Sequence, residues 1–406
     1  MILPKSGLGR SCPGEASNPT VSITCEGAFL VTRLGIGIVG YGFIGRVHLA
    51  AYLDIPVYYP HRTVEPVVVG ICSGSEASVE QARRAYAFKV ATTDFNELLA
   101  REDIDVIDIC TPNYLHREMV IAALRAGKHV YVDKPLALDA QEAQEVLAVA
   151  QMSPGKVQVG FQYRYIPAVL RAKQLVEQGF LGEIYHFHGA YLHAGYIDKN
   201  RPMSWRLRRE LAGGGALFDL GSHLVDLMTY LLGDFTHVRA SSHTFVPERP
   251  IAVGSATLEP VTVDDYTMLE AILATGGRGI IEASRFATGS NNDLSFQIHG
   301  SRGALRFNVM EPNWLHFYDA TLSDRPYGGF RGYTRIECVN RYEHGDFPGP
   351  KHEIGWMRYH IAAQYAFLES IVSGREPSPS VAEAYHVQRV LAAADRSANS
   401  GRWEQV

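Results

Sequence analysis

The sequence of 406 residues predicts an α/β fold in its first part and an α+β fold in its second. An apolar strand at Ile36–Val39 is followed by three closely spaced glycines and a potential helix. Strand-like and helix-like segments then alternate to about residue 150, which is typical of a parallel, doubly wound sheet. From Ile184 onward, long strands with alternating or aromatic side chains indicate a large, mostly antiparallel, open sheet.

The composition is that of a globular protein. Hydrophobic residues make up 46% of the chain and charged residues 20%, and the length is sufficient for two domains. A net charge of -5 gives no basic surface for nucleic acid, and no apolar run is long enough to span a membrane. The five cysteines include no CxxC pair, so we expect neither a disulfide framework nor a zinc knuckle, and we expect a reducing, cytoplasmic compartment.

The first thirty residues differ from the rest of the chain. They are rich in Gly, Pro and Ser, lack periodicity, and contain no apolar core of a signal peptide. We expect residues 1–30 to be a disordered or loosely held tail, and one hypothesis is that translation starts near Val31. The predicted domains are then residues 31–155, which bind a dinucleotide, and residues 156–406, which bind substrate and support oligomerisation.

Gly40, Gly42 and Gly45 have the spacing of a dinucleotide-binding turn. In such a turn the first glycine permits the tight bend, the second lets the backbone approach phosphate, and the third lets helix and strand pack closely. The motif alone is weak evidence, but the preceding strand and following helix predict a pyrophosphate at the helix N-terminus. Phe43 and Ile44, within the turn, are further cofactor-binding candidates.

The segments that follow continue the alternation. Asp94 is the expected N-cap of one helix and Gly127 the expected C-cap of another. The expected strands are Pro66–Cys72, Asp105–Cys110, His129–Val132 and Val157–Phe161, and the expected helices are Arg46–Leu53, Ser78–Tyr86, Phe95–Arg101, Arg117–Ala126 and Gln141–Ala150.

The second strand ends without the acidic residue that usually accepts hydrogen bonds from the adenosine ribose. Ser73 stands near that place. A small polar end could admit the 2′-phosphate of NADP, and Arg83 and Arg84 follow on the next helix, although they are as readily explained as solvated surface charges. The residues alone therefore leave NAD and NADP open.

Lys134 follows the strand at His129–Val132 and is the first catalytic candidate. A lysine at the carboxyl edge of a parallel sheet can hold or deprotonate a hydroxyl, although a surface lysine in a turn is the plain alternative. Residues near the strand ends are well placed to contact the nicotinamide ribose. The cofactor-binding candidates of this kind are Thr111, Pro112, Asn113, His116, Asp133, Lys134 and Gln162.

The second domain combines several helices with long strands. Thr321–Ile354 has many Gly, Pro and Tyr residues and no clear period, so we expect a long ordered excursion near an interface or the substrate mouth. The expected helices are Ile166–Gln178, Gly215–Leu232, Tyr359–Ser373 and Val381–Ser397, and the expected strands are Ile184–Tyr191, Val238–Phe245, Asp265–Leu273, Gly279–Arg285, Leu294–His299, Ala304–Asn308 and Trp314–Tyr318.

Asp219 and His223 form the second catalytic candidate. They lie four residues apart in a segment with an apolar face, so on an α-helix they share one side. A carboxylate one turn from a histidine can fix its tautomer and support its protonated form, as a general base requires. Asp226 adds a second carboxylate, which leaves a metal site as a weaker alternative because no second histidine has ligand spacing. A third interpretation is that these polar residues only support the structure of the helix.

The motifs GYGFIG, TPNYLH, DKPLAL and GGGALFDLGSHLVD together resemble the glucose–fructose oxidoreductase / inositol dehydrogenase / MocA family, roughly over residues 34–400. The resemblance implies an N-terminal Rossmann domain, a tightly held NAD or NADP, and hydride transfer to or from a carbinol carbon of a sugar or cyclitol. It assigns the acid/base role to His223, next to Asp219, and the polarisation of the same hydroxyl to Lys134. The family usually has EKP where this chain has Asp133-Lys134-Pro135, so the acid is shortened.

Further segments, among them QYRYIPA, MSWR and VPERP, are similar to the family's branch of levoglucosan and other sugar 3-dehydrogenases. This similarity favours NAD over NADP. It also implies that Tyr163, Arg164 and Trp205 line the substrate pocket with Lys134, Asp219 and His223, although each of the first three has a plain reading as a core or sheet-edge residue.

The function that the resemblance implies is a dehydrogenase acting on a sugar, anhydrosugar, glycoside or inositol. In this hypothesis His223 takes the hydroxyl proton, Asp219 orients His223, and Lys134 polarises the oxygen. One alternative is a glycosidase that oxidises C3 transiently with bound NAD, and another is a non-catalytic dinucleotide sensor, which would need no acid/base group. We expect no metal, no nucleic acid and no membrane partner, and we expect a homodimer or homotetramer.

Overall fold

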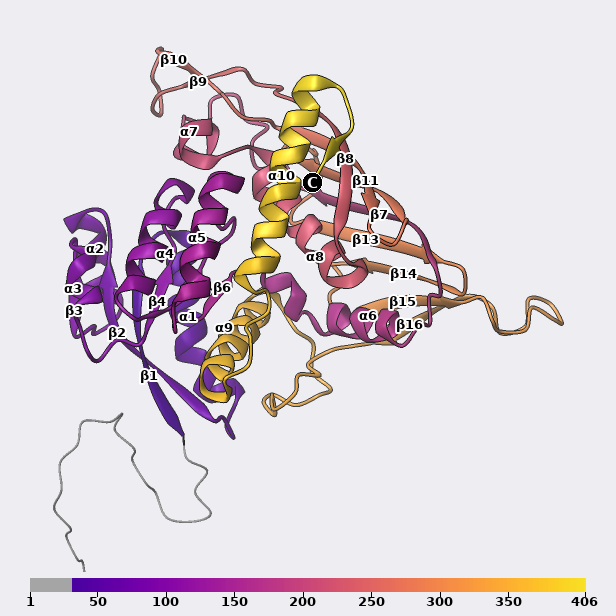
Figure 1. Cartoon of the computed structure of the whole chain (residues 1–406), viewed down its shortest axis with the longest axis horizontal. Helices are drawn as coiled ribbons and strands as arrows, with labels where there is room; N and C mark the ends of the chain where they lie inside the picture. The colour runs from indigo at the N-terminus through magenta and orange to yellow at the C-terminus, as the bar shows by residue number, and fades with distance from the viewer. Residues whose placement is uncertain (1–30) are drawn as a thin grey trace, which may run out of the picture.

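Six parallel strands form the first sheet, in the order β3-β2-β1-β4-β5-β6. The structure is a computed structural model that describes residues 31–406, so the expectations for the first thirty residues lie outside the described part (Figure 1). The order changes direction between β1 and β4, which places a crevice at their carboxyl ends. The strands are β1 (Thr32–Val39), β2 (Val64–Cys72), β3 (Val90–Thr92), β4 (Val106–Ile109), β5 (His129–Val132) and β6 (Val157–Val159).

Helices on both faces of this sheet complete a Rossmann domain. Asp94 caps α3 by accepting a hydrogen bond from the Asn96 amide, and Gly127 has a positive φ just after α4, as predicted. The first helix is longer than expected and continues through Pro56 to Tyr58. The helices are α1 (Phe43–Tyr58), α2 (Glu76–Ala85), α3 (Phe95–Leu99), α4 (His116–Arg125) and α5 (Ala140–Met152).

Nine strands form the second sheet, in the order β16-β15-β14-β13-β7-β12-β11-β8-β17. All neighbours are antiparallel except β7 and β12, so the predicted mostly antiparallel sheet is confirmed. Its strands are β7 (Ile184–Leu192), β8 (Phe235–His243), β11 (Tyr266–Leu273), β12 (Arg278–Ser284), β13 (Asp293–Gly300), β14 (Gly303–Asn308), β15 (Trp314–Asp319), β16 (Tyr333–Glu337) and β17 (Glu404–Gln405).

One face of the second sheet is covered and the other is open. Helices α6 (Pro167–Glu177), α8 (Ser222–Leu232) and α10 (Val381–Ser400) pack on the covered face (Figure 1). Buried and more exposed residues alternate along β11 and β13, as expected for a sheet with one solvated side. Tyr185, Met268 and Ile280 are exposed apolar residues of this sheet.

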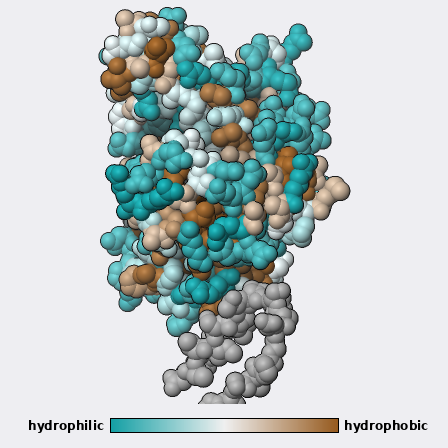
Figure 2. Space-filling view, turned by 90° about the vertical axis from the view of Figure 1, so that its left-hand side faces the viewer, coloured by the Kyte–Doolittle hydropathy of each residue, from teal (hydrophilic) through white to brown (hydrophobic). Residues whose placement is uncertain are grey.

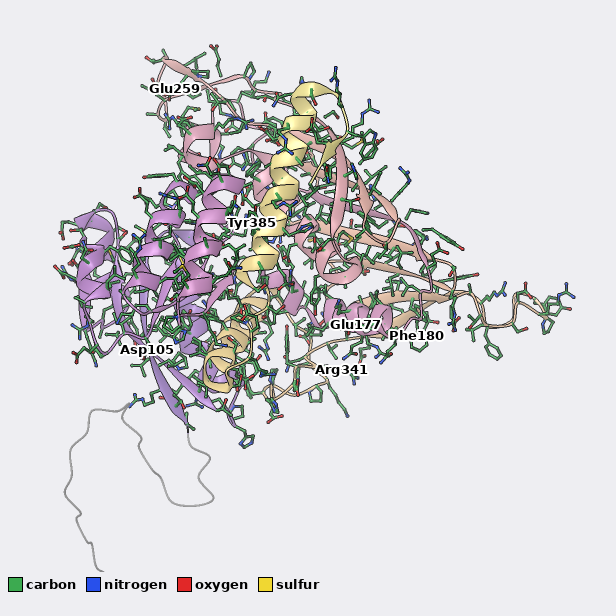
Figure 3. The ribbon with its side chains drawn as sticks, in the orientation of Figure 1. Asp105, Glu177, Phe180, Glu259, Arg341 and Tyr385 are labelled. Atoms are coloured by element: carbon green, nitrogen blue, oxygen red, sulfur yellow. The ribbon has the colours of Figure 1, made fainter. Side chains whose placement is uncertain are left out.

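The boundary between the domains differs from the predicted one at residue 155. Strand β6 pairs in parallel with β5, so residues 157–159 belong to the first sheet. Helix α9 (Trp356–Ser373) comes late in the chain but packs against α1, and Ile361 and Phe367 share a core cluster with Ile36 of β1. Tyr385 of α10 lies between the two domains (Figure 3). The last two long helices therefore join the halves.

Residues 321–354 contain both exposed and buried parts. The segment includes β16, which pairs with β15, and an arm that projects from the sheet with Tyr327 and Phe330 exposed (Figure 1). A small hairpin not predicted from the sequence, β9 (Glu248–Pro250) with β10 (Leu258–Pro260), carries Glu259 at another corner of the molecule (Figure 3). The face in Figure 2 shows hydrophobic residues scattered among hydrophilic ones. None of the helices described is long and apolar enough to cross a membrane.

Candidate active site at the boundary of the two domains

The glycine turn borders a cavity of about 390 Å³ at the carboxyl ends of the parallel strands. Gly40 has a φ of +100°, and a Cβ there would lie 2.6 Å from the carbonyl oxygen of Cys110. At Gly42 a Cβ would meet no atom within 4 Å, so the backbone faces open space. A Cβ on Gly45 would lie 2.0 Å from the Gly40 oxygen, so only glycine allows this strand–helix packing. The turn thus has the shape that a pyrophosphate requires.

Most of the predicted cofactor-binding residues line this cavity. The cavity also includes Trp205, which we had expected in the substrate pocket, and Arg206. Gly45 lies behind the turn, and Gln162 lines the neighbouring cavity instead. The candidates that line the first cavity are Gly40, Gly42, Phe43, Ile44, Ser73, Thr111, Pro112, Asn113, Asp133 and Lys134.

His116, which we predict as a cofactor-binding residue, lines neither this cavity nor the neighbouring one. Its ring is completely buried, with Nδ1 2.8 Å from the oxygen of Pro135 and Nε2 2.9 Å from that of Thr111. The ring therefore connects the segments that follow β4 and β5 and holds their relative position. A sequence pattern places a histidine near a strand end but does not show which way its ring turns.

The end of β2 carries no charge toward the cavity. Ser73 Oγ donates a hydrogen bond to Ser78 Oγ at 2.7 Å. Arg83 donates to the carbonyl of Ala91, and Arg84 pairs with Glu80. Both arginines are thus engaged along the surface, as their plain reading predicted, and neither lines the cavity.

A second cavity of about 620 Å³ adjoins the first and extends toward the sheet of the second domain. Lys134 and Asp219 line both cavities, as do Phe43, Ile44 and Arg206. Tyr163 and His223 line only the second, so the chain brings Lys134, Tyr163, Asp219 and His223 to one cavity.

Asp219 connects two cations at the junction of the cavities. Lys134 Nζ donates to Asp219 Oδ1 at 2.8 Å and to the Asp219 carbonyl at 2.7 Å, and Arg285 Nη2 donates to Oδ2 at 3.0 Å. Burial alone would raise the pKa of the Asp219 carboxyl, but Lys134, Arg285 and Arg206 hold it well below its usual range. Asp219 is therefore ionised at neutral pH. Two of the three donors of the Lys134 ammonium are engaged, which leaves one for a ligand.

Asp219 forms no hydrogen bond or ion pair with His223, contrary to the expectation from their spacing. The segment Leu217–Gly221 forms a π-helical turn before α8 begins at Ser222, so the i, i+4 alignment of an α-helix does not apply across it. Both carboxylate oxygens of Asp219 are instead directed to Lys134 and Arg285. The sequence of this segment, LFDLG, contains no proline that would predict a break in the α-helix.

The fold of this segment depends on Asp264. Its carboxylate accepts hydrogen bonds from the amides of Gly215 and Leu217, each at 2.8 Å. A Cβ on Gly215 would lie 1.8 Å from the Asp264 carbonyl oxygen, so the close approach requires glycine. Asp264 thereby fixes the start of the turn that carries Asp219.

His223 is a buried, neutral histidine beside the second cavity. Its ring packs against Phe161, Tyr163 and Tyr191, and its Nδ1 has no hydrogen-bond partner among the described residues. Burial and the nearby Lys134 ammonium hold the pKa of His223 well below its usual range. A neutral imidazole that lines a cavity can accept a proton from a bound hydroxyl.

Arg164, which the resemblance places in the substrate pocket, lines neither cavity. Its guanidinium is buried and donates three hydrogen bonds to Asp226, at 2.7–3.1 Å, and one to Glu383 of α10. Asp226 is thus occupied and does not form a metal site with Asp219 and His223. Within residues 31–406, the metal-ligand types that come together are His48, Asp108 and Cys110, where His48 pairs with Asp108 at 3.0 Å.

Several residues of the second cavity were missed. Tyr163 Oη lies 3.0 Å from Tyr191 Oη, and Asn292 contacts both hydroxyls, at 2.9 Å and 2.6 Å. Arg285, which lines the first cavity, was also missed; it follows directly after β12, so its position at a strand end is the signal that could have identified it. No local pattern indicated the remaining ones. The missed lining residues of the second cavity are Tyr191, His193, Arg206, Leu220, Asn292, Val309, Met310, Pro312, Gly355, Trp356 and Tyr359.

Comparison with known proteins matches each half of the chain to a domain of one oxidoreductase family. Residues 34–161 match the model of an oxidoreductase family with an NAD-binding Rossmann fold, and residues 169–306 match the GFO/IDH/MocA C-terminal domain. Levoglucosan dehydrogenase of Pseudarthrobacter phenanthrenivorans is 35% identical over 92% of this chain and 98% of its own length. Inositol 2-dehydrogenase of Rhizobium meliloti is 28% identical over 85% and 90%. The structure is also similar to that of levoglucosan dehydrogenase in complex with NADH, with a TM-score of 0.87, 35% identity, and coverage of 92% and 99%.

Proposed function

Because the chain belongs to the Gfo/Idh/MocA family of NAD-binding oxidoreductases, we propose that it is a dehydrogenase of cyclic polyols. It transfers a hydride between nicotinamide and a ring hydroxyl carbon of a sugar, anhydrosugar, glycoside or inositol. The observation that carries the proposal is the position of Lys134 and Asp219, which line both the cavity at the glycine turn and the adjoining cavity. A ligand in one cavity therefore meets a ligand in the other at these two side chains.

The residues of the first cavity suit a dinucleotide. The turn from Gly40 to Gly45 is open at Gly42, and its amides lie at the start of α1, where anions are favoured. NAD bound there supplies the hydride acceptor for the alcohol. NAD is the cofactor that the Rossmann match and the NADH-bound relative support, and NADP is the alternative because Ser73 replaces the usual acid.

Three residues of the chain have different roles toward the substrate hydroxyl group. Lys134 donates its remaining N–H to the substrate oxygen and polarises it. His223 accepts the hydroxyl proton, since its ring is neutral and faces the second cavity. Asp219 stays ionised and fixes the Lys134 ammonium, a role that replaces the expected contact with His223. The neutral base and the charged hydrogen-bond donor thus line the same cavity.

The lining of the second cavity favours a sugar with one apolar face. Polar groups of Tyr163, Asn292 and His193 lie on part of the lining, whereas Val309, Met310 and Trp356 supply apolar surface. Pyranose rings present hydroxyl edges and a carbon–hydrogen face, so an anhydrosugar or a glycoside fits this mixture best. The related levoglucosan dehydrogenase, whose name states an anhydrosugar substrate, supports this choice.

The remaining expectations concern alternatives and assembly. A glycosidase with transient C3 oxidation is not favoured, since the relatives with stated activities that are named above are dehydrogenases. We infer a homodimer or homotetramer, which the open face of the second sheet with its exposed Tyr185, Met268 and Ile280 supports. We also infer a cytoplasmic location, which the scattered cysteines without a CxxC pair support.

Reduction of NAD by a panel of sugars tests the proposal. The panel contains levoglucosan, glucose, a methyl glucoside and myo-inositol, each with NAD and with NADP. We expect NADH to accumulate with at least one of them, His223→Ala and Lys134→Ala to abolish most of the rate, and Lys173→Ala, on the surface of α6, to leave it unchanged. Unchanged rates in both site variants would reject the assignment. Bond cleavage without NADH accumulation would identify the glycosidase instead.

A further inference from the structure

Arg285 is a buried cation that has no assigned role in this site. It follows β12, its side chain is 1% exposed, and its backbone is held by the Asp265 carbonyl. The guanidinium lies over the ring of Tyr196 at 4.8 Å, and its Nε is buried without a partner among the described residues. Its Nη2 reaches Asp219 Oδ2 at 3.0 Å. A fully buried guanidinium that directs its charge to one carboxylate fixes that carboxylate strongly.

The contact determines how Asp219 meets Lys134. A carboxylate on a short side chain can rotate about its last bond, and either oxygen could then face the lysine. Since Arg285 holds Oδ2, Oδ1 is left in the direction of Lys134 Nζ, 2.8 Å away. The Asp219 carbonyl holds the same ammonium at 2.7 Å, so the lysine is fixed at two points. Its third donor is then restricted to the junction of the cavities.

We propose that Arg285 is a positioning residue of the dehydrogenase, which orients Lys134 through Asp219 so that the lysine meets the substrate hydroxyl. The proposal rests on the proposed function, because it concerns the same hydroxyl. It adds a residue from the second domain to a catalytic group that comes from the first. Misplacement of a catalytic group by about 1 Å is enough to reduce turnover by about 10²-fold.

Arg249 provides a matched control. It is also buried and lies near Tyr196, but it donates to the backbone carbonyls of Tyr196 and Asp198 and to no carboxylate. Loss of either arginine removes a buried cation from the same part of the second domain. Only the loss of Arg285 releases the carboxylate of Asp219.

A double-mutant cycle on kcat tests the proposal with the full chain, the substrate found in the panel, and saturating NAD. We expect Arg285→Met to lower kcat by about 10- to 100-fold, with a change in KM for the sugar of less than about threefold. In the Asp219→Asn background, the same substitution should lower kcat by less than about threefold further, because the group through which it acts is already lost. Arg285→Lys should recover part of the loss, since an ammonium can still donate to Oδ2.

The Arg249→Met control distinguishes a residue that positions Lys134 from a residue that only supports the fold. Arg249→Met should lower kcat by the same factor in both backgrounds, as expected for a structural residue. Multiplicative effects of Arg285→Met and Asp219→Asn would overturn the proposal, as would a loss that appears only in KM. If Arg285→Met does not fold, Arg285→Lys takes its place in the double-mutant cycle. Its fall in kcat should then also be smaller in the Asp219→Asn background than in the wild type. Absence of wild-type turnover on the whole panel would instead count against the proposed function.

Discussion

Asp219 and Asp226 lie on one helical segment, and each pairs with a buried arginine, yet their surroundings differ. Asp219 is 26% exposed, lines both cavities, and pairs with Lys134 and Arg285. Asp226 is 1% exposed, lines neither cavity, and pairs with Arg164, which reaches on to Glu383 of α10. The comparison teaches that an Arg–Asp pair marks a catalytic site only where a ligand can reach it. The first group is called the junction cluster below and the second the anchor cluster.

The largest expected effect is a loss of activity from the junction cluster. Lys134→Met should lower kcat by about 10³-fold, equal to about 4 kcal/mol in the activation barrier, because the substrate oxygen loses its charged donor. The melting temperature should stay within a few degrees of the wild type, since the pair is partly exposed. Steady-state kinetics and thermal melts measure the two effects. A kcat within tenfold of the wild type would contradict the assignment of Lys134.

Arg164→Met should lower the stability of the protein and leave its activity largely unchanged, the reverse of Lys134→Met. It leaves the buried Asp226 carboxylate without its partner, so we expect the free energy of unfolding to fall by about 3–5 kcal/mol. Urea denaturation followed by circular dichroism measures the loss. The folded fraction of the variant should keep its kcat at low temperature. A large fall in kcat with no loss of stability would place Arg164 in the substrate pocket after all.

The pH dependence of the free energy of unfolding tests whether His223, beside the junction cluster, is buried as a neutral imidazole. Burial lowers the pKa of His223 well below its ordinary 6.5, so the unfolded chain binds the proton first as the pH falls. The free energy of unfolding should therefore decrease below pH 6.5, by about 1.4 kcal/mol for each pKa unit of the difference. His223→Gln should flatten this part of the profile. Asp219, with a pKa lowered from 3.8, acts only at still lower pH. Parallel profiles for the two proteins would contradict the burial of a neutral His223.

Glu383→Gln should have the smallest effect of these substitutions on the free energy of unfolding. Glu383 is 36% exposed, so its ion pair with Arg164 is partly screened by solvent. The glutamine keeps the hydrogen bond to the Ser380 amide that caps α10. We expect a loss of about 0.5–1 kcal/mol in the free energy of unfolding and no change in kcat. A loss as large as that of Arg164→Met would show that Glu383, not Asp226, is the main partner of the arginine.

The sequence predicted the parts of the site that depend on local order. The glycine turn and Lys134 follow from strand–helix alternation and strand ends, and the Asp219–His223 segment follows from four-residue spacing in an expected helix. The structure brings all three to the two cavities. The role of Arg164 could not be predicted, because its partners lie 62 and 219 residues away in the chain. Asp219 and Lys134 are likewise 85 residues apart. The π-helical turn depends on tertiary contacts of Asp264 and leaves no periodic signal.

The return of α9 to the first domain has a consequence for biosynthesis. Ile361, Tyr365 and Phe367 complete the apolar cluster around Ile36 and Ile38. A ribosome that has released only the dinucleotide-binding part has therefore produced a sheet whose core lacks one wall. Domains usually fold as they emerge, but here the first-made half must wait for nearly the last residues of the chain. Truncation before α9 should leave both halves prone to aggregation, and the protein is best regarded as one cooperative folding unit.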